Sequence, residues 1–179
     1  MEGRKVLLVV AQQGYQGDEY SGPKSALEAA GFTVVTASDQ PGVATADDNS
    51  TTAIDITLDR IKVKEYEGIY FIGGSGAMEH LDSEQSYALI RAAMRLEIPI
   101  GAICISTRIL AKAGALQGKL ATGWDGDGAI GEIYKQHGAE YTGKDVTVDG
   151  IIVTAIGPRA AREFGAQIVS LLQDVRGWG

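Results

Sequence analysis

The stretch "IPIGAICISTRILAKAG", residues 98–114, decides the fold, because a continuous apolar run changes there into residues with helical spacing. The run predicts a short buried strand, and the residues after it predict a helix beginning near Cys104. Cys104 is the single cysteine of the chain, and the small residues Ala102 and Ser106 stand two positions before and after it. This pattern is typical of a nucleophile elbow, a tight turn that lifts a reactive side chain above a sheet.

Two interpretations of Cys104 follow from this position. In the first turn of a helix, free backbone N–H groups and the helix dipole favour the thiolate, which predicts a lowered thiol pKa. A free cysteine is also among the most commonly buried residues, and many only fill space in a core. The local pattern leaves both interpretations open.

Strands and helices alternate along the rest of the chain. Apolar runs predict strands buried on both faces at residues 5–11, 32–37 and 68–74. Helical spacing predicts helices at residues 23–31, 83–97 and 126–138 and from Pro158 onward, with Ser83 as an N-cap. We also expect an edge strand or hairpin at residues 54–61, a short strand at 120–124, and a hairpin between two further strands that turns at Asp149-Gly150.

This alternation predicts an α/β fold in one domain, residues 1–179, with a mainly parallel sheet covered by helices on both faces. Ligands of such sheets bind outside the carboxyl ends of the strands. Cys104 follows one predicted strand, and the glycine-rich turn "GGSG", residues 73–76, follows another. Because exposed N–H groups in such a turn can bind developing negative charge, the two turns form a candidate site.

Composition excludes several classes of function. The net charge of -7 and the pI near 4.8 argue against binding to nucleic acid or to an anionic membrane, since no cluster of Lys and Arg occurs. The longest apolar runs are far below the roughly 20 residues that cross a bilayer, and the beginning of the chain lacks the pattern of a signal peptide, so we expect a cytoplasmic protein. One cysteine and two histidines make a disulfide or a zinc site improbable, and we expect no metal.

Four segments resemble one known family: "DEYSGP" at 18–23, "FIGGSGAMEHL" at 71–81, "GAICISTRILAKAGALQGK" at 101–119 and "VDGIIVTAIGPRAAREF" at 148–164. Over nearly its whole length the chain resembles the ThiJ/PfpI superfamily, which has a class I glutamine amidotransferase-like fold. The resemblance implies a flavodoxin-like three-layer sandwich that forms a homodimer or a higher homo-oligomer. It is specific for the fold and the superfamily, and it does not specify a reaction.

The resemblance also implies roles for particular residues. Glu19 in "EYSGP" matches the acid that lies beside the cysteine in the family, where it is protonated and hydrogen-bonds the thiolate. The alternative is a solvated carboxylate that stabilises the helix dipole, as we expect for Asp18. The backbone amides of Gly74 and Ile105, with Gly73 beside them, match those that face the sulfur or the substrate oxygen.

The chain departs from both known branches of the family. Protease-like members have a histidine directly after the cysteine, where this chain has Ile105. Deglycase-like members have a histidine about twenty residues farther on, where Trp124 stands, and an arginine where Ile156 stands. Peptide hydrolysis therefore lacks an evident general acid for the leaving amine.

Three further residues are candidates for the same site. His80 and Glu79 follow the glycine-rich turn and could approach Cys104 from the same subunit or from a partner, or they could be ordinary surface residues. Trp124 could form an apolar wall against a substrate or belong to the core.

Together these observations predict a cofactor-independent cysteine enzyme that acts on a reactive carbonyl compound, such as a 2-oxoaldehyde or its adduct, as in glyoxalases and deglycases. Cys104 would add to the carbonyl, Glu19 would move the proton, and the amides of Gly74 and Ile105 would hold the oxyanion. One alternative is a redox-sensing stress-response protein in which Cys104 is oxidised to a sulfinate. A second alternative is an amidase or a peptidase.

Overall fold

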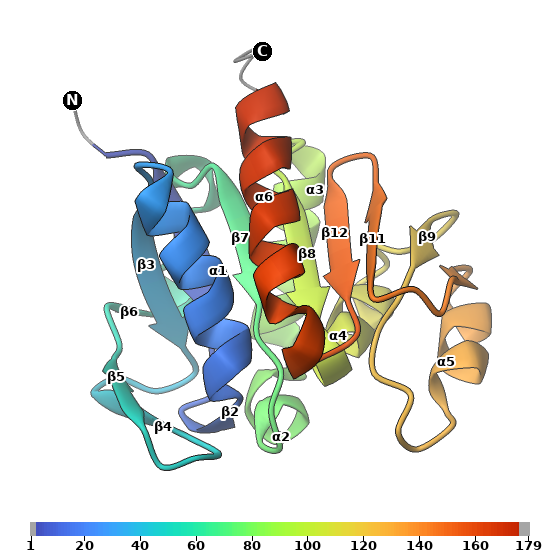
Figure 1. The fold of residues 1–179 in the computed structure, drawn as a ribbon, viewed down its shortest axis with the longest axis horizontal. Coiled ribbons are helices and arrows are strands. Elements are labelled where there is room, and N and C mark those ends of the chain that lie inside the picture. Colours follow the sequence, from blue (N-terminus) through green and yellow to red (C-terminus); the bar gives the residue numbers. More distant parts are fainter. Residues whose placement is uncertain (1–2, 176–179) are drawn as a thin grey trace.

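A seven-stranded sheet forms the centre of the protein, whose computed structural model describes residues 3–175 (Figure 1). In spatial order its strands are β11 (Val146–Asp149), β12 (Ile152–Ala155), β8 (Ile100–Ile103), β7 (Gly68–Phe71), β1 (Lys5–Val9), β3 (Thr33–Ser38) and β6 (Ile56–Thr57). Neighbouring strands run parallel, except β11, which runs antiparallel to β12. The expected mainly parallel sheet is therefore confirmed.

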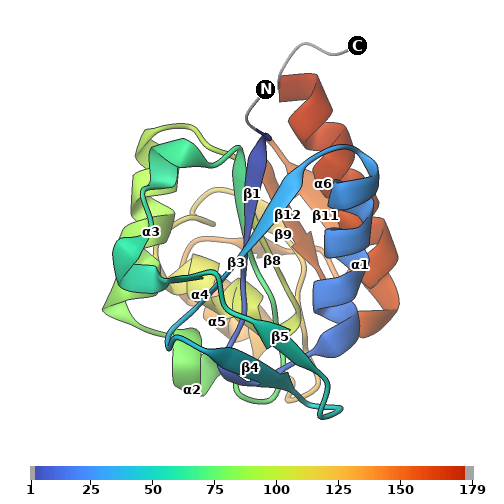
Figure 2. The ribbon, with the colours of Figure 1, turned by 90° about the vertical axis from the view of Figure 1, so that its left-hand side faces the viewer.

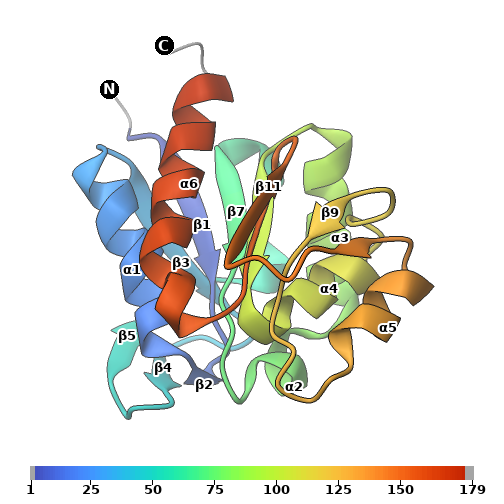
Figure 3. The same ribbon diagram turned by 45° about the vertical axis from the view of Figure 1, so that its right-hand side comes forward.

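Helices cover both faces of this sheet, which gives three layers (Figures 2 and 3). Helices α1 (Gly17–Ala29) and α6 (Ala161–Val175) pack together on one face. Helices α3 (Glu84–Arg95) and α4 (Thr107–Lys112) cover the other face (Figure 2). Because both faces are covered, every residue of β7, β8 and β12 is buried, which explains their mainly apolar sequences. The hydroxyl of the buried Thr154 in β12 accepts the N–H of Thr122.

One group of shorter elements lies at the carboxyl ends of the parallel strands, at the bottom of Figure 1. A small sheet has the order β2 (Gln13–Tyr15), β4 (Val43–Ala46) and β5 (Thr51–Ala53), and helix α2 (Ala77–Leu81) lies beside it. A two-stranded sheet of β9 (Leu120–Ala121) and β10 (Glu140–Tyr141) lies next to α5 (Ile130–Gln136). Four 3₁₀ helices complete the described chain: η1 (Leu58–Arg60), η2 (Val63–Glu65), η3 (Cys104–Ser106) and η4 (Pro158–Ala160).

Several predicted boundaries are confirmed and others are corrected. The Ser83 side chain caps α3 by accepting the N–H of Ser86. Helix α1 begins at Gly17 rather than at Pro23, which lies inside it, and Pro158 begins η4, one turn before α6. The expected hairpin or edge strand at 54–61 is reduced to the edge strand β6, parallel to β3.

The β11–β12 hairpin turns one residue later than expected. Asp149 pairs with Ile152, so the two loop residues are Gly150 and Ile151, and the φ of Gly150 is +59°. Asp149 instead remains in the strand, where its side chain accepts the N–H of Leu120. Within residues 3–175, none of the helices combines the length and the hydropathy needed to span a bilayer.

Candidate active site

Cys104 lies at the tight turn between β8 and α4, as the sequence predicts. Its φ of +63° is in the left-handed region, which is costly for a residue with a side chain and typical of functional turns. Its carbonyl oxygen accepts the Thr107 hydroxyl at 3.0 Å and the Trp124 N–H at 3.2 Å. These two bonds hold the turn in its strained conformation.

The small neighbours of Cys104 make this turn fit against β7. Ala102 and Ser106 are completely buried, and the Ser106 hydroxyl donates to the Ile72 carbonyl at 2.7 Å. Ser106 and Thr107 therefore use their hydroxyl groups to fix the backbone, and neither lines the cavity at Cys104.

Glu19, in the first turn of α1, is completely buried. Its N–H donates to the Gln16 side chain at 2.7 Å, and its Oε1 accepts the N–H of Gly73 at 2.9 Å. Burial raises the pKa of this carboxyl group from 4.5 to about 7, although hydrogen bonds from Cys104 and Gly73 oppose the rise. The expected position beside the cysteine is therefore observed, and the solvated alternative is wrong.

The expected lowering of the Cys104 pKa is wrong. Burial raises the pKa of the thiol from 9.0 to about 12, and the charge of Glu19 raises it further, while the Ile105 N–H and Arg108 act in the opposite direction. The sequence argument considered only the helix end and not a carboxyl group packed against the sulfur. At neutral pH the sulfur is therefore a protonated thiol, and the Glu19 carboxyl group beside it, with a pKa of about 7, is about half ionised.

Gly73 leaves room for this pair. A Cβ atom on Gly73 would lie 2.5 Å from Glu19 Oε1 and 2.8 Å from the Cys104 Cβ. Gly74 has a φ of +131°, and a side chain there would meet the Gly14 carbonyl oxygen at 2.3 Å. The missing side chain of Gly73 thus lets the turn lie against the carboxyl and thiol groups, and that of Gly74 lets it lie against the backbone near Gly14.

Cys104 and Glu19 line a cavity of about 320 Å³. Nine residues form its wall: Gln16, Glu19, Asp47, Gly74, Ser75, Cys104, Ile105, Trp124 and Pro158. Gly74, Ile105 and Trp124 thus occupy the places that the sequence predicts. Gln16, Asp47, Ser75 and Pro158 were missed, because polar loop residues and a helix-initiating proline carry no local signal of a shared cavity.

His80 and Glu79 are not among the residues that line this cavity. The His80 Nδ1 lies 2.7 Å from Asp39 Oδ2, so the imidazole joins α2 to the end of β3. Glu79 is exposed on α2. In this chain neither side chain is brought to Cys104.

Arg108 holds the segment that contains Trp124. Its guanidinium makes a bidentate pair with Asp127 at 2.9 and 2.7 Å and donates to the Trp124 carbonyl at 3.2 Å. The same group lies 5.4 Å from the centre of the Trp124 ring. The arginine is buried, and its hydrogen bonds lower the pKa of Asp127 to about 2, so this ion pair fixes one wall of the cavity.

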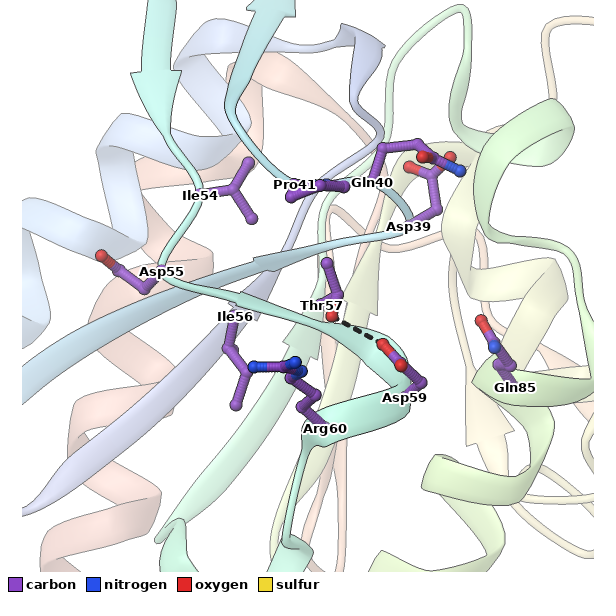
Figure 4. Close-up of a pocket in the computed structure, with 10 residues that line it drawn as sticks. All are labelled: Asp39, Gln40, Pro41, Ile54, Asp55, Ile56, Thr57, Asp59, Arg60 and Gln85. Carbon is purple, nitrogen blue, oxygen red and sulfur yellow. Dashed lines mark hydrogen bonds between the residues drawn. The ribbon is translucent and has the colours of Figure 1, made fainter.

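A second cavity, of about 800 Å³, lies beside the edge strand β6 (Figure 4). Its acidic residues bind neighbouring segments: Asp55 accepts the Thr36 N–H, Asp59 accepts the Thr57 hydroxyl, and Asp39 contacts His80. Among residues 3–175, no group of three His, Cys, Asp or Glu side chains is arranged to hold a metal ion. We therefore place the candidate active site at the smaller cavity, where the thiol and its carboxyl partner meet.

The chain is similar to known proteins over most of its length. A protein of Methanocaldococcus jannaschii with no assigned function is 30% identical over 174 residues, which are 97% of this chain and 84% of that protein. A protein of Pyrococcus horikoshii named a deglycase is 26% identical over 169 residues, 94% of this chain and 99% of its own.

Solved structures show the same fold. A ThiJ/PfpI domain protein from Brachyspira murdochii superimposes with a TM-score of 0.90 at 24% identity, covering 97% of this chain and 99% of its own. Drosophila melanogaster DJ-1beta gives a TM-score of 0.79 at 23% identity, covering 98% of this chain and 96% of its own. A sequence model described as the DJ-1/PfpI family matches residues 4–171. The chain therefore belongs to the DJ-1/PfpI family.

Proposed function

We propose that this protein is a cysteine-dependent enzyme that acts on 2-oxoaldehydes or their adducts, with Cys104 as nucleophile and Glu19 as its proton partner. The observation that carries this proposal is the buried contact between the two side chains at a strained turn that opens into a cavity. The similarity to a protein named a deglycase supports the substrate class.

The raised thiol pKa changes the expected first step. A preformed thiolate would be scarce at neutral pH, so the Glu19 carboxylate accepts the Sγ proton while Sγ bonds to the aldehyde carbon. The carbonyl oxygen becomes an oxyanion, for which the N–H groups of Gly74 and Ile105 are the proposed donors. A carboxylate whose pKa is about 7 is a stronger base than an ordinary one and suits this transfer.

The later steps need no external oxidant or reductant. Glu19 first returns the sulfur proton to the oxyanion, which gives a neutral hemithioacetal and restores the carboxylate. The hydrogen on the former aldehyde carbon is acidified by the neighbouring ketone, and the Glu19 carboxylate takes it as a proton and delivers it to the ketone carbon. The hemithioacetal hydroxyl proton passes to the ketone oxygen, so one carbon is oxidised by two electrons and the other reduced by two. Water then cleaves the resulting thioester and regenerates the Cys104 thiol. In the overall reaction, one 2-oxoaldehyde and one water molecule give one 2-hydroxy acid.

The test is consumption of methylglyoxal together with formation of lactate. We expect activity in the wild type and none above the uncatalysed rate in Cys104→Ser and Cys104→Ala, with circular dichroism showing that both variants fold. A methylglyoxal adduct of N-acetyllysine tests deglycation in parallel. A wild-type protein that consumes neither compound contradicts the proposal.

The two alternatives have less support. Oxidation by peroxide requires the thiolate, and the raised pKa of Cys104 makes that form scarce. Peptide or amide hydrolysis requires an acid for the leaving amine, and within residues 3–175 no histidine lines the cavity. A homodimer and a cytoplasmic location remain predictions, the first of which light scattering tests.

A further inference from the structure

The charged side chains that line the Cys104 cavity are all acidic. Glu19 lies beside the sulfur, and Asp47 lies on the exposed rim. No lysine, arginine or histidine is among the described residues that form the wall. Arg108 is close enough to act on the Cys104 charge, but its guanidinium is bound to Asp127 and to the Trp124 carbonyl. A substrate in the cavity therefore meets negative charge, and none of the described side chains that line the cavity is cationic.

Asp47 is held firmly in this position. It follows β4 in the turn of the β4–β5 hairpin, and its backbone N–H donates to the Tyr15 carbonyl at 2.8 Å. Its Oδ2 accepts the Ser75 N–H at 3.0 Å, and its Oδ1 accepts the Ser75 hydroxyl. The carboxylate is thus tied to the glycine-rich turn, next to Gly74, and cannot easily swing away from an entering ligand.

Apart from the two N–H groups proposed to hold the oxyanion, the other lining residues offer no charge that would compensate an anion. Ile105, Trp124 and Pro158 line the same cavity, and none has a charged side chain. Gln16 is polar but neutral, and its side-chain oxygen accepts the Glu19 N–H. A carboxylate bound in the cavity would therefore lose water either against an apolar surface or against Asp47, and both losses are costly.

We propose that Asp47 is a specificity-determining residue that rejects carbonyl compounds bearing a carboxylate and admits neutral or cationic ones. The identification of the ligands as carbonyl substrates rests on the proposed function, whereas the discrimination by charge depends only on the cavity. For one carboxylate acting across a partly hydrated cavity, the Coulomb interaction gives roughly a threefold to tenfold preference.

Alkylation of Cys104 tests this discrimination without requiring turnover. Iodoacetamide and iodoacetate are nearly matched in size and differ by one negative charge, and their rates are compared at one pH with those of 2-mercaptoethanol. We expect the amide-to-acetate rate ratio of the wild type to exceed that of 2-mercaptoethanol by at least about threefold, and Asp47→Asn to lower it by roughly three- to tenfold. Because both reagents report on the same thiol at one pH, changes in thiol ionisation cancel from the ratio.

Asp18→Asn is the matched control. Asp18 is an exposed acid in the first turn of α1, next to Glu19 in sequence, but it does not line the cavity. Its substitution removes the same charge from the protein and should leave the ratio within about twofold. If both substitutions lowered the rate ratio equally, the discrimination would come from the net charge of the protein, and the inference about Asp47 would be wrong.

Two further measurements complete the test. In the wild type alone, 1 M NaCl should reduce the rate ratio, which keeps the inference testable if Asp47→Asn does not fold. In turnover, glyoxylate, a small aldehyde whose carboxylate replaces the ketone and which can therefore only inhibit, should inhibit methylglyoxal consumption at lower concentration in Asp47→Asn than in the wild type. Wild-type ratios equal to those of 2-mercaptoethanol and insensitive to salt overturn the inference. A biased ratio without methylglyoxal turnover supports it and contradicts only the proposed function.

Discussion

Glu19 and Cys104 are in contact, and the carboxylate raises the pKa of the thiol while the thiol lowers the pKa of the carboxyl group. These opposite effects are those of a hydrogen bond in which the thiol is the donor. Above a pH of about 7 the resting pair is therefore a neutral thiol beside a carboxylate, and below that pH both groups are protonated. Activation of the sulfur must accompany its attack on the substrate.

Replacing Glu19 by Gln should make the Cys104 thiol more acidic and at the same time slow the turnover of methylglyoxal. Burial, the larger cause of the raised Cys104 pKa, remains in Glu19→Gln, but we expect the variant to lower this pKa below about 12 because the nearby negative charge is removed. Turnover of methylglyoxal should nevertheless fall by about 100-fold or more, because the group that accepts the proton is lost. The pH dependence of iodoacetamide alkylation gives the thiol pKa. Turnover that matches the wild type would contradict the role of Glu19.

The pH dependence of the reaction should follow the Glu19 carboxyl group. Since only the ionised form can accept the thiol proton, kcat/KM for methylglyoxal should rise with pH and be half-maximal near pH 7. Initial rates between pH 5 and 9 measure this limb. A half-maximum near pH 4.5 would show instead that the buried carboxyl group behaves as an exposed one.

Glu19 should also make folding stability depend on pH. Its pKa is higher in the folded protein than in the unfolded chain, so the folded state binds the proton more tightly between pH 4.5 and about 7. The stabilisation by this proton is complete below pH 4.5 and is lost as the pH rises through about 7, by about 3 kcal/mol in total. Urea denaturation at pH 4.5 and 8 should show this loss in the wild type relative to Glu19→Gln. An equal difference between the two proteins at both pH values would contradict it.

Adding one methyl group at Gly73 should damage the site from within. In Gly73→Ala the new Cβ would overlap Glu19 Oε1 and the Cys104 Cβ, so we expect a loss of about 1–3 kcal/mol in stability and of most activity. Gly131→Ala is the control, because Gly131 lies in α5 with no atom within 4 Å of the added Cβ. That substitution should be neutral or stabilising by up to about 1 kcal/mol. Melting curves and methylglyoxal assays compare the two, and equal effects would exclude a specific clash.

Arg108→Lys should loosen the wall that contains Trp124. Lysine cannot make the bidentate pair with Asp127, so the segment from 124 to 127 should become more accessible to solvent. In a Trp178→Phe background, acrylamide should quench Trp124 more strongly in this variant, and KM for methylglyoxal should rise. Lys112→Ala is the control. Lys112 lies on α4, as Arg108 does, and its side chain pairs with Asp82 at the end of α2, so its loss should change neither the quenching nor KM. Unchanged quenching in Arg108→Lys would contradict the proposed support.

The buried frame of the fold could be predicted from the sequence because its signals are local. Strands β1, β7 and β8 are uninterrupted apolar runs, and the turn at Cys104 needs the small residues Ala102 and Ser106. The place of Glu19 came from the family resemblance, since no spacing along the chain shows that a residue of α1 reaches the end of β8.

The rim of the cavity could not be predicted in the same way. Strands β4 and β5 are three or four residues long and rich in Ala and Thr, so they lack the alternating pattern of a half-buried strand. The thiol pKa was wrong for a related reason, because it depends on burial and on a through-space neighbour. Such effects require the assembled structure.

The β4–β5 hairpin, which carries Asp47, belongs to a separate small sheet. Cys104 directly follows β8, a central strand of the main sheet. The reacting atom and Asp47, the proposed filter for incoming molecules, thus stand on different sheets and meet at the glycine-rich turn. Changes in the length or charge of the hairpin would alter which substrates enter while the thiol and its carboxyl partner stay in place. An engineer could exploit the same division by building libraries in the hairpin alone.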